Sequence, residues 1–201
     1  ISSPVDGKLI LFDTFDFQDD LLQDFNNHRF NIINKSRQLG ISTIAAGYIA
    51  WMLMFHRQKN ILVLATKLET ASNLVKKVKI MVKGVPEWMK IAKIKTDNKH
   101  SFELDNGSQI KASASSADAG RSEALSLLVI DEAAHIENLD DLWAAIYPTI
   151  STGGRCIALS SPNGVGNWFY ETYVGAEEGK NLFKPTNLPW DVHPKRDQQW
   201  F

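Results

Sequence analysis

The sequence is poor in several features that define whole classes of protein. Its 201 residues contain one cysteine, Cys156, so no disulfide can form within the chain and a reducing, intracellular setting is expected. No apolar run is long enough to span a membrane, and no signal peptide is visible. The five histidines are scattered, without the spacing of metal ligands. The formal net charge of −1 gives no global basic field of the kind that attracts nucleic acid.

What the sequence does contain is typical of a globular protein. Hydrophobic residues make up 44% and charged residues 22%, an ordinary balance for a chain with a packed core. The length suits one domain over residues 1–201, in which 1–16 is expected to form an N-terminal arm and 184–201 a C-terminal extension. No internal repeat or low-complexity segment interrupts it.

The chain is organised around residues 34–43, which lie between the apolar run 30–33 and the apolar segment 44–55. A short buried strand, a loop containing Gly and a helix that opens with Ser and Thr have the layout of a phosphate-binding loop. Backbone N–H groups at a helix N-terminus point at an anion, and the helix dipole favours negative charge there. The hydroxyl of Ser42 is then in reach of a magnesium ion held by the phosphates.

This loop departs from the G-x-x-x-x-G-K-[ST] pattern at two positions. Asn34 or Lys35 stands where the first Gly is expected, and Ile41 stands where the lysine is expected. The alternative interpretation is a plain helix N-terminus, in which Ser42 or Thr43 closes the first turn. The loop alone does not decide between the two.

A second motif favours the phosphate loop. The apolar run 127–130 does not alternate, which is typical of a strand buried on both faces of a parallel sheet, and it ends in Asp131 and Glu132. Open α/β sheets bind ligands at the carboxyl ends of their strands. We expect Asp131 to hold magnesium, and Glu132 to orient and deprotonate an attacking water. The alternative, two solvated acids at a strand end, leaves the loop upstream unexplained.

The remaining pattern predicts alternating strands and helices. Residues 61–66 and 156–159 are expected to be strands, and 101–112 to be a hairpin because Asn106-Gly107 is a strong turn signal. Helices are expected after Gln18 and at 42–55, 69–82 and 167–173, with a short amphipathic stretch at 142–150. This order predicts an α/β fold with a mainly parallel sheet, and a domain that binds and hydrolyses a nucleotide.

Three features allow two interpretations each. The amide of Gln18 suits the edge of adenine, although spacing alone favours a surface glutamine on a helix. Eight lysines and two acids lie between Lys76 and Lys99, and they either follow a phosphate backbone or, more usually, form a solvated face. The polar residues from Ser160 to Gly164 either sense the γ-phosphate or make a Pro-Asn-Gly turn.

Taken together, these motifs resemble the ATPase domain of the large terminase subunit of tailed bacteriophages, and most of all that of T-even-like phages and their cyanophage relatives. The likeness runs from about Phe17 to the C-terminus. It rests on Ser36-Arg37-Gln38-Leu39-Gly40, on Asp105-Asn106-Gly107-Ser108, on Ser113-Ala114-Ser115-Ser116 followed by Arg121, and on Ser160 to Gly164.

The resemblance implies a RecA-like P-loop ATPase of the ASCE class that uses ATP and Mg²⁺. Such proteins form a ring on the portal protein of an empty capsid, act with a small terminase subunit, and move double-stranded DNA into the capsid in the host cytoplasm. The resemblance places Gln18 by the adenine, makes Glu132 the catalytic carboxylate, and makes Arg121 a finger on a neighbour's ATP. It assigns phosphate binding to Ser36, Arg37, Gln38, Leu39, Gly40, Ile41, Ser42 and Thr43, magnesium to Ser42 and Asp131, and coupling of hydrolysis to movement to Ser160, Ser161 and Asn163.

Two departures from the family pattern matter. Family members continue into an RNase H-like nuclease domain, so this chain, which ends at Phe201, is expected to lack nuclease activity. Some terminases and ParA-like ATPases carry the signature lysine at the front of the loop, where Lys35 stands, and we expect Lys35 to replace the missing lysine. Two rival interpretations are a helicase-like translocase and a nucleotide-binding scaffold that no longer hydrolyses.

Overall fold

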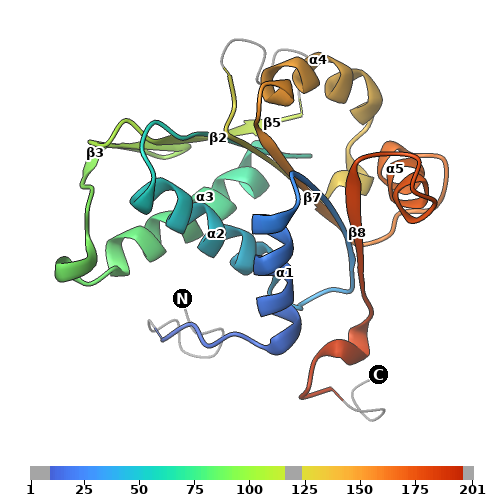
Figure 1. Cartoon of the computed structure of the whole chain (residues 1–201), viewed down its shortest axis with the longest axis horizontal. Coiled ribbons are helices and arrows are strands. Elements are labelled where there is room, and N and C mark those ends of the chain that lie inside the picture. Colours follow the sequence, from blue (N-terminus) through green and yellow to red (C-terminus); the bar gives the residue numbers. More distant parts are fainter. Residues whose placement is uncertain (1–9, 116–123, 197–201) are drawn as a thin grey trace.

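The structure is a computed structural model that describes residues 10–115 and 124–196 (Figure 1). Its strands are β1 (Phe30–Lys35), β2 (Asn60–Ala65), β3 (Ile94–Asn98), β4 (Ser101–Leu104), β5 (Gln109–Ala114), β6 (Leu127–Asp131), β7 (Arg155–Ser160) and β8 (Phe183–Leu188). Its helices are α1 (Asp16–Asn27), α2 (Ile41–Phe55), α3 (Leu68–Gly84), α4 (Leu139–Ser151) and α5 (Trp168–Glu177), and short 3₁₀ turns are η1 (Glu87–Met89), η2 (Ala133–His135) and η3 (Trp190–Val192). No described helix has both the length and the apolar character needed to cross a membrane.

The strands form one eight-stranded sheet in the order β3-β4-β5-β2-β6-β7-β1-β8. Of the described strands only β4 runs against the others, because it pairs antiparallel with both β3 and β5, while the remaining pairs are parallel. The predicted α/β fold with a mainly parallel sheet is thereby confirmed. Since β2, β6, β7 and β1 run in one direction, their carboxyl ends open at the same edge of the sheet.

The central strands are mostly apolar because helices cover both faces of the sheet (Figure 1). Alternate side chains such as Ile33 and Val129 join a core with α1, α2 and α3. Their neighbours Ile32 and Leu128 join a second core with α4 and α5 on the opposite face. This alternation also fixes on which face each polar side chain at a strand end must lie.

The order of the central strands positions the two predicted motifs. Strand β7 pairs with both β1 and β6, so it separates the strand that precedes the loop from the strand that carries the acids. Asn34 is in register with Ser160, and Asp131 with Leu159. The loop after β1 and the acids after β6 therefore meet across the end of β7.

Two strands were not expected from the sequence. The tail from residue 184 was interpreted as a C-terminal extension, but Phe183–Leu188 forms β8, which pairs with β1 along its whole length. The expected boundary therefore falls inside the sheet. Pro185 argues against a strand because proline has no backbone N–H to donate. In β8, however, the missing donor is tolerated because β8 is an edge strand. The other unexpected strand, β3, lies within the lysine-rich stretch 76–99.

That stretch is folded so that several of its lysines meet acids. Lys79 and Lys83 on α3 both contact Asp97 on β3, at 2.7 and 2.9 Å. Lys95 contacts Glu103 across the β3–β4 pair at 2.9 Å. Hydrogen bonds from Lys79, and to a smaller extent from Lys83, lower the pKa of Asp97, so this carboxylate is charged at neutral pH. Pairing on this scale fits a solvated face better than a surface reserved for phosphates.

Candidate nucleotide-binding site

The predicted phosphate loop occupies residues 36–40, between the end of β1 and the start of α2. Gly40 is the N-cap of α2 and has a left-handed backbone with φ of 74°. A Cβ atom at this position would also lie 2.8 Å from Nε2 of Gln18, so two independent constraints favour glycine. No side chain caps this helix. The alternative in which Ser42 or Thr43 caps a plain helix is therefore wrong.

The loop presents backbone donors that nothing else uses. Within residues 10–115 and 124–196, the N–H groups of Arg37, Gln38 and residues 40–42 have no hydrogen-bond acceptor. On either side the donors are used: Ser36 N–H donates to the Leu188 carbonyl at 2.9 Å, and Thr43 N–H to the Gly40 carbonyl at 2.9 Å. A run of unpaired N–H groups that ends at a helix N-terminus is an anion-binding nest.

Lys35 and Ile41 occupy different environments. Ile41 is buried in the core with 2% of its surface exposed, so this position contributes packing and no charge. Lys35 is the last residue of β1, and alternation places it on the same sheet face as Asp131 and α2. Burial raises the pKa of Asp131, and the positive charge of Lys35 opposes part of that rise. Arg37 is exposed in the middle of the loop.

Asp131 and Ser42 are brought together as predicted. Ser42 Oγ donates a hydrogen bond to Asp131 Oδ2 at 3.2 Å, although the two residues lie on different elements. Burial raises the pKa of Asp131, and the charge of Lys35 and the Ser42 hydrogen bond partly oppose this. A carboxylate beside a hydroxyl is an oxygen donor set that suits Mg²⁺, which binds proteins through one or two such groups and completes its shell with phosphates and water.

Glu132 follows Asp131 in a left-handed backbone conformation, with φ of 56° and ψ of 39°. This conformation is uncommon for a residue with a side chain, and such positions concentrate at functional sites. Glu132 is exposed at the site edge, and Thr66 Oγ1 at the end of β2 donates to its Oε2 at 3.5 Å. Thr66 directly follows an apolar strand at the same edge of the sheet, but its local sequence does not mark it as a functional residue.

The predicted coupling residues lie around the turn that follows Glu132. Ser160 is fully buried; its Oγ accepts from Ala134 N–H at 3.1 Å and donates to the Ser161 carbonyl at 2.8 Å. Asn163 Nδ2 donates to the Ala134 carbonyl at 3.1 Å. Ser161 Oγ lies 3.4 Å from His135 Nε2. The end of β7 is thus bonded to η2 through several groups, which is more than a Pro-Asn-Gly turn requires.

Gln18 is not the surface glutamine that its spacing favours. Only 3% of its surface is exposed. Its Nε2 donates to the Leu39 carbonyl at 2.9 Å, and its Oε1 accepts from Phe15 N–H at 3.1 Å. Gln18 therefore connects α1 to the phosphate loop, and this contact between distant segments could not be read from helix periodicity.

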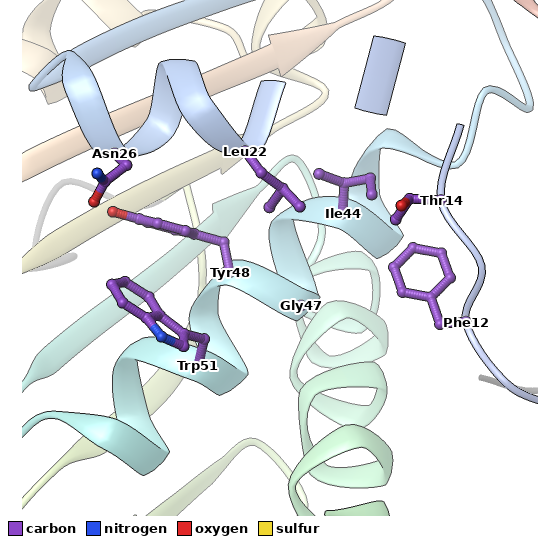
Figure 2. Close-up of a pocket in the computed structure, with 8 residues that line it drawn as sticks. All are labelled: Phe12, Thr14, Leu22, Asn26, Ile44, Gly47, Tyr48 and Trp51. Atoms are coloured by element: carbon purple, nitrogen blue, oxygen red, sulfur yellow. The ribbon is translucent and has the colours of Figure 1, made fainter. Parts of the chain in front are cut away.

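Arg121 falls outside the described residues. A hollow of about 490 Å³ lies between the N-terminal segment, α1 and α2, and Figure 2 shows Tyr48 and Trp51 along one side of it. It is lined by Phe12, Thr14, Leu22, Asn26, Ile44, Gly47, Tyr48 and Trp51, with no charged side chain. Because it offers no cation, we assign the phosphates to the loop instead.

The burial of Asp131 gives a prediction about stability. The raised pKa means that the folded, nucleotide-free protein holds a proton more tightly than the unfolded chain does. Folding therefore loses stability as pH rises from the ordinary aspartate pKa through the raised value. Asp131→Asn, which carries no charge, should melt at a higher temperature than the wild type near pH 7, with no such gain below about pH 3.8, the ordinary pKa.

Thermal melts without nucleotide at both pH values test this expectation. Asp20→Asn, on the exposed surface of α1, is the matched control and should leave the melting temperature unchanged. If Asp131→Asn melts no higher than that control near neutral pH, burial is not what dominates the carboxylate's ionisation.

Comparisons with known proteins find a family and several solved structures to which this chain is similar. The family described as "Terminase large subunit, T4likevirus-type, N-terminal" matches residues 32–198. The large terminase ATPase domain of Thermus phage P74-26 is similar over 94% of this chain and 86% of that one, with a TM-score of 0.78 at 21% identity.

Two longer proteins share the fold. The large terminase of the thermophilic bacteriophage D6E in complex with ADP has a TM-score of 0.72 at 15% identity, over 92% of this chain and 48% of that one. The HK97 bacteriophage large terminase has a TM-score of 0.71 at 17% identity, over 92% and 41%. With a family match that spans most of the sequence, the chain belongs to the T4likevirus-type large terminase family, and it matches the N-terminal part of that subunit.

Proposed function

We propose that this domain hydrolyses ATP in the presence of Mg²⁺ at the edge formed by β1, β6 and β7, and that hydrolysis drives double-stranded DNA into a procapsid. The observation that carries the proposal is the pairing of two features at one point. Unpaired backbone N–H groups of residues 37, 38 and 40–42 lie on one side, and Asp131, bonded to Ser42, lies on the other. The first set binds phosphate oxygens, and the second has the ligands that magnesium prefers.

Each residue then has a chemical role. The loop N–H groups bind the β- and γ-phosphates, and Lys35 adds a full positive charge where backbone dipoles supply only partial ones. Ser42 and Asp131 would hold Mg²⁺. When bound, this ion neutralises charge on the β- and γ-phosphate oxygens. Within the described residues, no three His, Cys, Asp or Glu side chains are grouped so that they could hold a metal ion by themselves.

Glu132 is the general base in this scheme. Its exposed carboxylate accepts a proton from the water that attacks the γ-phosphate, and Thr66 Oγ1 restrains one carboxylate oxygen at 3.5 Å. The backbone of Glu132 is fixed because its N–H donates to Asp131 Oδ1 at 3.0 Å. The two acids therefore keep separate tasks, one at the metal and one at the water, although they are adjacent in sequence.

The bonds from β7 to η2 suggest how hydrolysis is coupled to movement. Ser160 and Asn163 bind the N–H and the carbonyl of Ala134, two residues after Glu132. A change in the position of Glu132 after hydrolysis is therefore passed to the end of β7. We propose that the domain acts on the portal protein as a ring of identical subunits in the host cytoplasm, with the small terminase subunit as a partner and Arg121 acting on a neighbour's ATP.

The test is Mg²⁺-dependent ATP hydrolysis by the purified protein, followed by packaging of DNA into empty procapsids. Ser42→Ala removes a metal ligand, and the Mg²⁺ concentration needed for half-maximal phosphate release should rise by about 10–100-fold. Ser151→Ala, at the far end of α4, should behave as the wild type. A wild-type protein that binds no ATP in the presence of Mg²⁺, or a Ser42→Ala protein with an unchanged Mg²⁺ requirement, would contradict the proposed site.

A further inference from the structure

We propose that Arg196 is a positioning residue that holds the phosphate loop in its anion-binding conformation and ties the C-terminal segment 189–196 to the nucleotide state. The inference rests on the proposed function of the loop, and it concerns a residue that is far from every motif in the sequence. Arg196 Nη2 donates to the carbonyls of Arg37 and Gln38, at 3.2 and 2.9 Å.

The orientation of these two carbonyls determines the orientation of the backbone N–H groups that follow them in the loop. In a planar trans peptide the carbonyl of one residue and the N–H of the next point in opposite directions. The carbonyl of Arg37 shares a peptide plane with the N–H of Gln38, one of the unpaired donors, so the hydrogen bond from Arg196 to this carbonyl fixes the opposite direction for that N–H. The same restraint supports Gln38, whose φ of 60° is uncommon for a residue other than glycine.

A second chain of contacts links the same segment to the loop. His193 packs against Phe15 with ring centroids 4.8 Å apart. Phe15 N–H donates to Gln18 Oε1 at 3.1 Å, and Gln18 Nε2 donates to the Leu39 carbonyl at 2.9 Å. Three successive loop carbonyls are therefore held from behind, two by Arg196 and one by Gln18. Both sets of contacts start from segment 189–196, because His193 and Arg196 both belong to it.

The arrangement gives segment 189–196 a way to respond to ATP. Phosphate binding and Arg196 binding act on opposite sides of the same peptide units, so each favours the loop conformation that the other requires. Coupling of this kind is reciprocal: a nucleotide that orders the loop also tightens the hold of Arg196, and loss of Arg196 weakens nucleotide binding.

Arginine suits this position better than lysine does. One guanidinium nitrogen bridges two carbonyls, and the planar fork keeps that geometry with little loss of side-chain entropy. Lys195 next to it is exposed, and its side chain forms no hydrogen bond or ion pair with the loop in the part of the chain that the structure describes. The adjacent pair therefore provides a matched comparison.

The test combines steady-state kinetics with hydrogen exchange on the full chain. Arg196→Ala should raise the KM for ATP on the order of tenfold, as expected for loss of hydrogen bonds from a charged donor, with a smaller fall in kcat. In the nucleotide-free protein, backbone amides of residues 189–196 should exchange faster in Arg196→Ala than in the wild type. Adding ADP should slow their exchange in the wild type and much less in the variant.

Two further variants sharpen the result. Arg196→Lys should recover part of the KM, and Lys195→Ala should match the wild type in both measurements. An Arg196→Ala protein with wild-type KM and wild-type exchange would overturn the inference. The exchange measurement without nucleotide is independent of activity. A wild type that does not bind ATP would therefore defeat the proposed function, whereas faster exchange in Arg196→Ala would still support the anchor.

Discussion

Glu132→Gln should bind ATP with near wild-type affinity and hydrolyse it about 10²–10⁴ times more slowly, the usual cost of losing a general base. The amide has the shape of the carboxylate and can still accept the hydrogen bond from Thr66, which joins its side chain at 3.5 Å. It cannot accept a proton from water. The backbone of this position is held by the bond from its N–H to Asp131, so the substitution leaves the metal ligand in place.

Single-turnover phosphate release and equilibrium binding of a fluorescent ATP analogue separate the two effects. Glu171→Gln makes the same chemical change on the exposed surface of α5 and should hydrolyse ATP normally. Near-normal turnover by Glu132→Gln would remove this carboxylate from the mechanism. Loss of ATP binding would instead show that Glu132 acts on the bound nucleotide and not on the water.

Lys35→Ala should lower kcat by roughly 10²–10³, the range seen when one donor that stabilises transition-state charge is removed, and it should also weaken ATP binding. Charge shifts on the γ-phosphoryl group during transfer, and the loop N–H groups supply only partial positive charge there. Lys35 is the loop's candidate for a full cation because Ile41, at the usual lysine position, is buried in the core. Arg37 becomes the candidate if Lys35→Ala retains wild-type hydrolysis.

Two controls isolate the charge of Lys35 from the packing of the loop. Ile41→Val keeps a buried β-branched side chain, so it should cost about 0.5–1.5 kcal/mol of stability and leave kcat close to the wild-type value. Lys59→Ala removes the lysine that directly precedes β2, at the opposite edge of the sheet, and should leave kcat unchanged. A kcat loss in Ile41→Val equal to that in Lys35→Ala would mean that loop packing, and not the cation, sets the rate.

Much of the fold could be predicted from the sequence because it depends on local patterns. The apolar runs 30–33, 61–65 and 127–130 specify buried strands, since residues covered on both faces need no polar alternation. Asn106-Gly107 specifies the hairpin because few residue pairs adopt the backbone that a tight turn requires. Alternation of these runs with helical segments then specifies a parallel sheet, and a parallel sheet places Lys35, Asp131 and Ser160 at one edge.

What the sequence could not provide depends on contacts between residues far apart in the chain. The strand β8 exists because β1 offers it a free edge, and its own sequence, with Pro185, does not favour a strand. Gln18 is buried because the Leu39 carbonyl, 21 residues away, needs a donor. Thr66 meets Glu132 only because β2 and β6 are neighbours in the sheet.

The candidate site likewise has parts that could be predicted from the sequence and parts that depend on long-range contacts. The sequence by itself determined the donors and the acids, because loop glycines, helix starts and strand-end carboxylates are local features. Only the tertiary structure determined which other residues hold these donors and acids in position. Arg196 and Gln18 hold the loop carbonyls from behind, and Ser160 and Asn163 hold the turn after Glu132. The physical reason is that a hydrogen bond to a backbone carbonyl leaves no mark on the sequence of the segment that accepts it, since every residue has one.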